Sequence, residues 1–256
     1  AFFIKDALKF GAKYVITDHS KILIKSNKIF KTENCLSFLL KIAKEKRNIF
    51  SGKIIAITGS VGKTTIKELL KFFLSFNNKT SASIKSYNNY LGVLISLLNL
   101  DIKSSFAIFE VGTNNFNEIK KLASIILPEQ VIITNIFPTH LKNFKSTKNI
   151  AIEKSDLFNP KYNSRIQMVI LPSSNLDEVF LSKLAHKYKI KSVITYSNAK
   201  KANYNIEKIT NIKESTSKVI FNTPSKKILT KVSTLVEHQI INILVCLIIF
   251  QYNKLN

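Results

Sequence analysis

From Lys53 onward, short apolar runs alternate with segments whose apolar residues have helical spacing. The runs lie at 53–58, 106–111, 130–136, 168–172 and 191–197. The segments between them predict helices near 63–76, 89–99, 115–126, 147–158 and 176–188. Continuous apolar runs separated by helices are typical of parallel strands that are buried on both faces. We therefore expect an α/β fold with a mostly parallel sheet and helices on both of its faces.

The two ends of the chain have different patterns. Residues 4–48 predict a helix, a short strand and a second helix, which is too little for a complete domain. Residues 204–235 alternate in short runs and predict a small antiparallel patch. The last helix is expected at about 237–252, and its apolar stretch is too short for a membrane span and contains Asn242. We read 1–49 as the end of one domain and 50–256 as a second.

Charge and cysteine content restrict the partners of the chain. The formal net charge of +23 would attract nucleotides, nucleic acid or an anionic membrane surface. The lysines are spread along the chain and form no basic block, so no nucleic-acid partner is expected. Cys35 and Cys246 are far apart, with no metal-ligand spacing around them. This predicts neither a disulfide nor a zinc site, and a reducing compartment such as the cytoplasm.

The segment TGSVGKTT directly follows the first apolar run and precedes a predicted helix. Gly59 and Gly62 would let backbone N–H groups turn toward phosphate oxygens, and the start of the helix adds a favourable dipole. Lys63 would reach the terminal phosphates, and the Thr64 hydroxyl would ligate Mg²⁺. Ile57 stands where the Walker A pattern has its first glycine. The strand–loop–helix context nevertheless predicts phosphate binding.

Three further side chains are expected at the same edge of the sheet. Glu110 ends an apolar run before Gly112, a position suited to a second Mg²⁺ ligand or to orienting water. His140 lies just past the next run, and Lys154 lies in a predicted helix. A lone histidine is more often structural and a helical lysine is usually solvated. On the residues alone, only Glu110 is favoured as functional.

Taken together, five segments of the chain resemble the Mur ligases, the ATP-dependent amide-forming enzymes of peptidoglycan precursor synthesis. The order and spacing of the segments carry the resemblance: TGSVGKTT, NNYLGV (88–93), EVGTNNFNEI (110–119), TNIFPTHL (134–141) and AIEK (151–154). Within the family they look most like the branch that joins D-Ala-D-Ala to a UDP-N-acetylmuramoyl-tripeptide. Folylpolyglutamate synthase shares the loop but matches the segments around Asn88 and Glu110 less well.

The resemblance implies ATP and Mg²⁺ as cofactors. The ATP phosphates would be held by Gly59, Ser60, Val61, Gly62, Lys63, Thr64 and Thr65. Thr64 and Glu110 would anchor one Mg²⁺, and His140 would ligate a second. Lys154 matches a lysine that the family carbamylates with CO₂, which turns an ammonium into an anion that supports a metal.

The resemblance also assigns the nucleotide base and the substrates. His238 and Asn242 match a segment near the base, and Asn88 and Asn89 match a region near the UDP-sugar phosphates. UDP-N-acetylmuramoyl-tripeptide and D-Ala-D-Ala would be the substrates of a monomeric cytoplasmic enzyme. An acyl phosphate would form first and then be attacked by the amine. Of the three family domains, residues 1–49 match the end of the first and 50–256 the second, and the C-terminal ligase domain is absent from this sequence.

Several positions depart from the family pattern. Val236 and Asn117 stand where glycine is usual, Leu94 where proline is common, and LPSSN (171–175) where an Asn-Ala-Asp-Asp run is expected. These departures concern the base and loop regions. Two other classes stay open at this point: a P-loop GTPase or nucleic-acid-stimulated ATPase, although no NKxD segment follows the loop, and a non-catalytic remnant.

Overall fold

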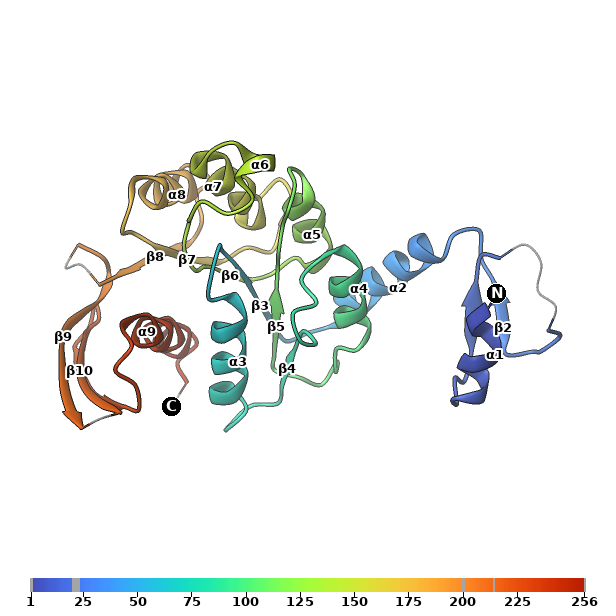
Figure 1. The fold of residues 1–256 in the computed structure, drawn as a ribbon, viewed down its shortest axis with the longest axis horizontal. Coiled ribbons are helices and arrows are strands. Elements are labelled where there is room, and N and C mark those ends of the chain that lie inside the picture. Colours follow the sequence, from blue (N-terminus) through green and yellow to red (C-terminus); the bar gives the residue numbers. More distant parts are fainter. Residues whose placement is uncertain (1, 20–23, 199–200, 214, 256) are drawn as a thin grey trace.

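A nine-stranded sheet forms the centre of the protein (Figure 1), which a computed structural model describes at residues 2–19, 24–198, 201–213 and 215–255. The strand order is β11-β10-β9-β8-β7-β6-β3-β5-β4. All pairs from β9 to β4 are parallel, and β10 is antiparallel to both of its neighbours, β9 and β11. The strands are β3 (Lys53–Thr58), β4 (Thr80–Ala82), β5 (Phe106–Glu110), β6 (Gln130–Ile133), β7 (Met168–Pro172), β8 (Ser192–Ser197), β9 (Tyr204–Lys213), β10 (Thr216–Asn222) and β11 (Lys227–Val232).

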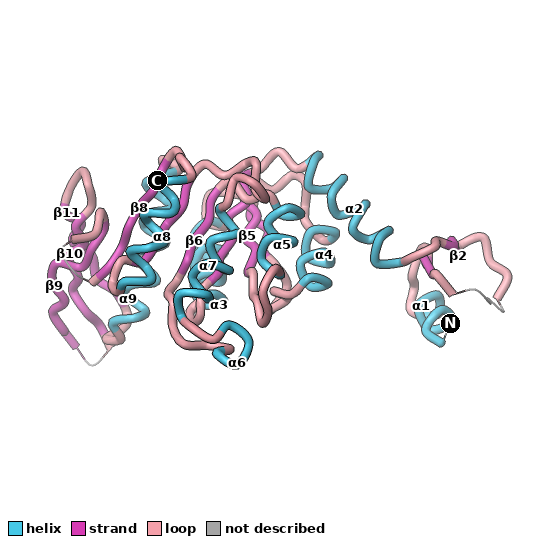
Figure 2. Tube along the Cα trace, turned by 90° about the horizontal axis from the view of Figure 1, so that it is seen from above, coloured by secondary structure: helices cyan, strands magenta, loops and turns pink. Residues whose placement is uncertain are grey.

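Helices cover both faces of the sheet (Figures 1 and 2). α3 and α9 pack against each other on one face, and the other helices of the main body cover the opposite face. The helices are α2 (Cys35–Ile49), α3 (Lys63–Leu74), α4 (Tyr90–Leu98), α5 (Glu118–Ile126), α6 (Leu141–Phe144), α7 (Thr147–Ser155), α8 (Leu176–Lys187) and α9 (Glu237–Tyr252), with a short 3-10 turn η1 (Asp156–Phe158) after α7.

The central strand β3 shows why these residues form a doubly covered sheet. Ile54 and Ala56 enter the core beneath α2, α4, α5, α7 and α8, whereas Ile55 and Ile57 enter the core beneath α3 and α9. Alternate side chains of a strand point to opposite faces, so a strand that is apolar at every position must be covered twice. All four of these side chains are fully buried.

The N-terminal residues form a small unit at one end of the molecule (Figure 1). It contains α1 (Phe2–Lys9) and a two-stranded parallel sheet of β1 (Val15–Thr17) and β2 (Ile29–Lys31). α2 leads from this unit to the main body. At its end the buried Arg47 donates to Glu129 at 2.6 Å, and Glu129 also accepts from the Ile54 N–H at 2.8 Å. This pair ties α2 to the start of β3.

The structure confirms the predicted fold class, the five parallel strands, the antiparallel patch and the final helix. The apolar segment of that helix is buried in the core beneath the sheet. Among the described residues no helix is long and apolar enough to cross a membrane. Cys35 and Cys246 are free thiols, as expected. The sequence did not indicate β2, β4 or α6, and several ends differ: β6 stops at Ile133 instead of continuing to 136.

Candidate nucleotide and catalytic site

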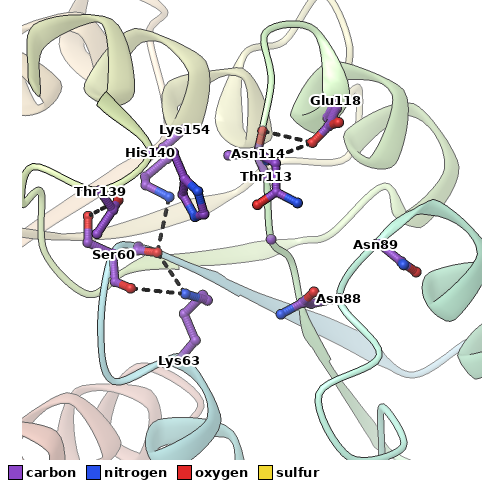
Figure 3. A pocket seen from close by; sticks show the side chains of 12 residues that line it. Ser60, Lys63, Asn88, Asn89, Thr113, Asn114, Glu118, Thr139, His140 and Lys154 are labelled. Carbon is purple, nitrogen blue, oxygen red and sulfur yellow. Dashed lines mark hydrogen bonds between the residues drawn. The ribbon is translucent and has the colours of Figure 1, made fainter. Parts of the chain in front are cut away.

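The candidate site lies where the carboxyl ends of β3, β5 and β6 meet at one edge of the sheet. A cavity of about 120 Å³ opens there (Figure 3). It is lined by Gly59, Ser60, Lys63, Asn88, Asn89, Gly112, Thr113, Asn114, Glu118, Thr139, His140 and Lys154. Seven of the predicted site residues, which come from four separate segments, therefore share one cavity, because parallel strands deliver their following loops to the same edge.

The loop between β3 and α3 depends on its two glycines. Gly59 has φ +146°, and a Cβ there would lie 1.9 Å from Thr134 Oγ1. Gly62 has φ +87° and directly precedes α3. Both backbone conformations disfavour L side chains, so a residue with a Cβ would strain the loop at either position. The glycines predicted for phosphate binding are required by the shape of the loop itself.

The backbone N–H groups of the loop fall into two sets. Those of Ser60 and Val61 donate to the carbonyl and the side-chain oxygen of Asn135, at 3.1 and 2.9 Å. Asn135 therefore holds the outer part of the loop, although it was not among the predicted site residues. By contrast, α3 begins at Lys63 with no side-chain cap. The N–H groups of a first helical turn lack intrahelical partners, so these are the donors suited to an anion.

Glu110 is held by two of the other predicted residues. One carboxylate oxygen accepts from Thr64 Oγ1 at 2.7 Å, and the other accepts from Asn88 Nδ2 at 2.8 Å. Glu110 is 2% exposed, so it lies beneath the cavity that Asn88 lines. The close approach of Asn88 also requires Gly112, where a Cβ would lie 2.8 Å from the Asn88 side chain.

Lys63 and Lys154 donate to the same carbonyl group. The Nζ atoms of the two lysines lie 2.9 and 3.0 Å from the Gly59 oxygen, and Lys63 also donates to the Ser60 carbonyl at 3.2 Å (Figure 3). Burial lowers the pKa of Lys63, although Glu110 opposes this shift. Burial and the nearby Lys63 charge lower the pKa of Lys154 to about 7, although Glu153 opposes this shift. Lys154 therefore carries a substantial fraction of neutral amine at neutral pH.

Two carboxylates that the sequence did not single out as site residues support the site: Glu118, which is partly buried, and Glu153, which is buried. Glu118 accepts from the N–H groups of Asn114 and Asn115, at 2.8 and 3.3 Å, and lines the cavity. Burial raises its pKa, but these hydrogen bonds outweigh the effect and the pKa is lowered overall. Glu153, next to Lys154, accepts from the Asn117 N–H at 2.8 Å. It thereby fixes α7 to the start of α5.

The remaining predicted residues lie at the border of the site. His140 lines the cavity from the exposed start of α6, close to Lys154 (Figure 3). The Asn89 side chain accepts from the Gly92 N–H at 2.9 Å and caps α4, so its amide group has a structural partner. Asn242 of α9 faces the loop, with its side-chain oxygen 3.8 Å from where a Gly62 Cβ would lie. His238 is exposed in the first turn of α9.

Val61 and Thr65 are exposed and do not line the cavity.

The oxygen atoms around Glu110 suit Mg²⁺. A carboxylate and a threonine hydroxyl already lie within hydrogen-bond distance of each other, and Mg²⁺ prefers such hard oxygen ligands. Within the part of the chain that the structure describes, no group of three or more His, Cys, Asp or Glu side chains could hold a metal. The metal ligands predicted from the sequence form a different kind of group, because they combine a hydroxyl, one carboxylate and one histidine with a modified lysine.

A family model describes most of this chain. The Mur ligase middle domain matches residues 57–250. The chain belongs to the Mur ligase family. Curated relatives are the UDP-N-acetylmuramoyl-tripeptide–D-alanyl-D-alanine ligases of Rickettsia prowazekii, 36% identical over 78% of this chain, and of Borreliella burgdorferi, 34% identical over 68% of it. This chain spans only 44% and 35% of the length of those two relatives.

Solved structures share the fold of this Mur ligase chain. A MurF ligase from Thermotoga maritima in complex with ADP matches with a TM-score of 0.85 and 22% identity. The match covers all of this chain and 57% of the Thermotoga chain. At this identity the match shows the fold, and it confirms the architecture derived from the strand pattern.

A second hollow in this Mur ligase chain adjoins the cavity. It measures about 930 Å³ and shares Asn89, Gly112, Asn114 and Glu118 with the cavity. Its other lining residues come from α2, α4 and α5 and are mostly apolar, with two lysines: Leu36, Leu40, Lys44, Tyr90, Leu91, Lys121, Leu122, Ser124 and Ile125. A groove that is apolar with a few charged groups, next to a polar cavity, can hold a molecule whose reactive end enters the cavity.

Proposed function

We propose that this chain supplies the ATP and Mg²⁺ site of a ligase that adds D-Ala-D-Ala to UDP-N-acetylmuramoyl-tripeptide in the cytoplasm. The observation that carries the proposal is the convergence of Lys63, the Thr64–Glu110 pair and Lys154 on one sheet edge, in a member of the Mur ligase family. The names of the curated relatives support the substrate assignment.

The proposed reaction brings two anions together. A carboxylate of the tripeptide attacks the γ-phosphorus of ATP, the bond to the β,γ-bridging oxygen breaks, and ADP leaves. Lys63 and the N–H groups at the start of α3 would stabilise the charge on the transferred phosphoryl group. Mg²⁺ bound to Thr64 and Glu110 would neutralise phosphate charge when present. The amine of D-Ala-D-Ala then attacks the acyl carbon, inorganic phosphate leaves, and the amine proton is lost to solvent.

Lys154 has the chemistry that carbamylation requires. Only a neutral amine can attack CO₂, and a lysine pKa of about 7 provides one at physiological pH. The nitrogen bonds to the carbon of CO₂ and releases a proton to solvent, which leaves an anionic carbamate. With His140 on the same cavity wall, that carbamate would support a second metal. The resulting anion also removes the repulsion between Lys154 and Lys63.

The two parts of the chain would have separate tasks. We assign residues 1–49 to the end of the UDP-substrate domain and 50–256 to the central ATP-binding domain. The groove between α2, α4 and α5 would hold the peptide-bearing substrate, with Asn88 and Asn89 near its phosphates. His238 and Asn242 would lie near the adenine. Since this chain spans 44% of the Rickettsia relative, we expect the 256 residues to bind nucleotide but not to form the amide.

Calorimetry with ATP on the 256-residue chain tests the phosphate site. Lys63→Ala should abolish binding, whereas Lys71→Ala, at an exposed lysine two turns along the same helix, should leave it unchanged. Unchanged affinity of Lys63→Ala would refute the assignment of the loop. Incubation with ¹³C-bicarbonate should give a carbamate carbon signal that Lys154→Met lacks.

Amide formation is tested on a protein of the relatives' full length, supplied with ATP, UDP-N-acetylmuramoyl-tripeptide and D-Ala-D-Ala. ATP hydrolysis that rises with added RNA or DNA and ignores the muramoyl peptide would favour a nucleic-acid-stimulated ATPase instead. Nucleotide binding without phosphoryl transfer in that protein would favour a non-catalytic remnant.

A further inference from the structure

Lys67 is a fully buried lysine on α3, one turn beyond Lys63 and Thr64. Its ammonium group donates to the backbone carbonyls of Ser83, at 3.1 Å, and of Lys85. Its third partner is a carboxylate oxygen of Glu68 at 3.0 Å. The ammonium therefore has two carbonyl acceptors and one ion-pair partner, and a lysine is rarely buried without such compensation.

The backbone that Lys67 binds leads directly into the candidate site. Ser83 follows β4, and its hydroxyl accepts from the Glu110 N–H at 3.2 Å. Lys85 has φ +44°, a left-handed conformation that is unusual for a residue other than glycine. Three residues later Asn88 donates to the Glu110 carboxylate at 2.8 Å. The contacts of Lys67 thus fix the start of the loop that carries Asn88.

Glu110 is consequently held from two sides, by elements that Lys67 joins. Thr64 on α3 binds one carboxylate oxygen, and Asn88 on the loop binds the other. Lys67 is on the same helix as Thr64 and bonds to the same loop as Asn88. A shift of the loop relative to α3 would move the two groups apart and rotate the carboxylate between them.

We propose that Lys67 is a positioning residue, which orients Glu110 for a divalent metal by fixing the Asn88 loop to the phosphate-loop helix. The inference rests on the proposed nucleotide and metal site. It assigns Lys67 no contact with phosphate, because its side chain is fully buried and its ammonium group is already held by two carbonyls and a carboxylate. Loss of Lys67 should therefore weaken metal binding and leave the binding of the nucleotide phosphates unchanged.

Replacing Mg²⁺ with Mn²⁺, which can be detected spectroscopically, separates the effect on metal binding from the effect on nucleotide binding. Mn²⁺ affinity is measured by electron paramagnetic resonance on the 256-residue chain with saturating ADP, and ADP affinity by calorimetry in EDTA. Lys67→Met should raise the Mn²⁺ Kd by about 10–100-fold, the usual effect of removing a group that orients a metal ligand. ADP affinity in EDTA should stay within about twofold, and Lys67→Arg, which keeps a cationic donor, should restore part of the Mn²⁺ affinity.

Lys71→Met is the matched control, since Lys71 is exposed on the same helix and, within the described residues, no hydrogen bond or ion pair joins its side chain to the loop around Asn88. Its Mn²⁺ Kd should equal that of the native chain. Asn88→Ala should lower the Mn²⁺ affinity as Lys67→Met does. The loss of binding free energy in the double variant should be smaller than the sum of the losses in the two single variants. If Lys67→Met loses its cooperative melting transition, Asn88→Ala carries the test, and unchanged Mn²⁺ affinity there overturns the proposal.

The outcomes distinguish this inference from the proposed function. A native chain that binds neither ADP nor Mn²⁺ refutes both. A native chain that binds both, with a folded Lys67→Met variant that binds Mn²⁺ equally well, refutes only the positioning role. Equal losses of ADP and Mn²⁺ affinity in Lys67→Met would also refute it, because they would show a general structural role.

Discussion

The buried Lys154 makes the stability of this protein depend on pH in a direction that can be worked out from its surroundings. Its pKa is lowered from the ordinary value of 10.5 to about 7, first by burial and then by the Lys63 charge. At about 1.36 kcal/mol per unit of pKa shift, the folded state disfavours the protonated lysine by about 5 kcal/mol. Below pH 7 the folded and unfolded chains both carry the proton, so this cost is present in full.

Above pH 7 the folded chain releases the proton while the unfolded chain still holds it. Stability rises with pH wherever the unfolded state binds more protons, so the native chain should gain stability between pH 7 and about 10. Between pH 7 and pH 9 the gain amounts to about 2 kcal/mol, from the same relation. Lys154→Met removes the titrating group and should not show this gain. It should be the more stable protein at pH 7, because Lys63 still donates to the Gly59 carbonyl.

Urea unfolding in CO₂-free buffer between pH 6.5 and 9.5 measures the effect, and exclusion of CO₂ prevents formation of a carbamate. Lys148→Met, at an exposed lysine of the same helix, should follow the native curve. The free energy of unfolding of the native chain minus that of Lys154→Met should rise by about 2 kcal/mol from pH 7 to pH 9. Parallel curves over that range would refute the reasoning, since they would mean that Lys154 keeps an ordinary pKa in the folded protein.

Three further substitutions test the packing around the site. Thr58→Val should raise the free energy of unfolding by about 1 kcal/mol, because the buried Thr58 hydroxyl has no partner among the described residues; urea unfolding measures this. Gly59→Ala should lower the melting temperature and reduce the free energy of unfolding by about 1–3 kcal/mol or more, since φ is +146° and a Cβ would overlap Thr134. An unchanged melting curve would contradict the loop geometry. Glu129→Gln should reduce the free energy of unfolding by about 3–5 kcal/mol, because the buried Arg47 loses its ion pair. A reduction below about 1 kcal/mol, measured by calorimetry, would contradict this.

Local sequence patterns were enough to predict most of the fold. β3 and β7 match their predicted bounds because each is a continuous apolar run, and burial of such a run on both faces specifies a strand. β4 was missed because its three residues, TSA, have no periodicity, and it forms only through pairing with β5. The order of the strands in the sheet could likewise not be predicted from local patterns, because it depends on which strands pair.

The site was predictable where chemistry is local and not where it depends on distant contacts. The loop that contains Lys63 has a recognisable spacing, so its position was correctly inferred. Lys154 and Lys67 look like ordinary helical lysines in the sequence, and their burial becomes visible only once Gly59 and the Ser83 carbonyl are placed against them. Asn117 is explained by the backbone: it has φ +71°, a conformation that asparagine tolerates where glycine is usual.

The contact between the phosphate loop and α7 at Gly59 brings two positive charges together. Two ammonium groups converge on one neutral carbonyl, and Glu110, the carboxylate that acts on Lys63, is shared with Thr64 and Asn88. Lys63 consequently lowers the pKa of Lys154, which shows that the pair is not fully compensated within the protein. Such a site gains free energy from any added negative charge. On the proposed function that charge comes from two sources, the phosphates of ATP beside Lys63 and a carbamate formed on Lys154, and both relieve the same repulsion.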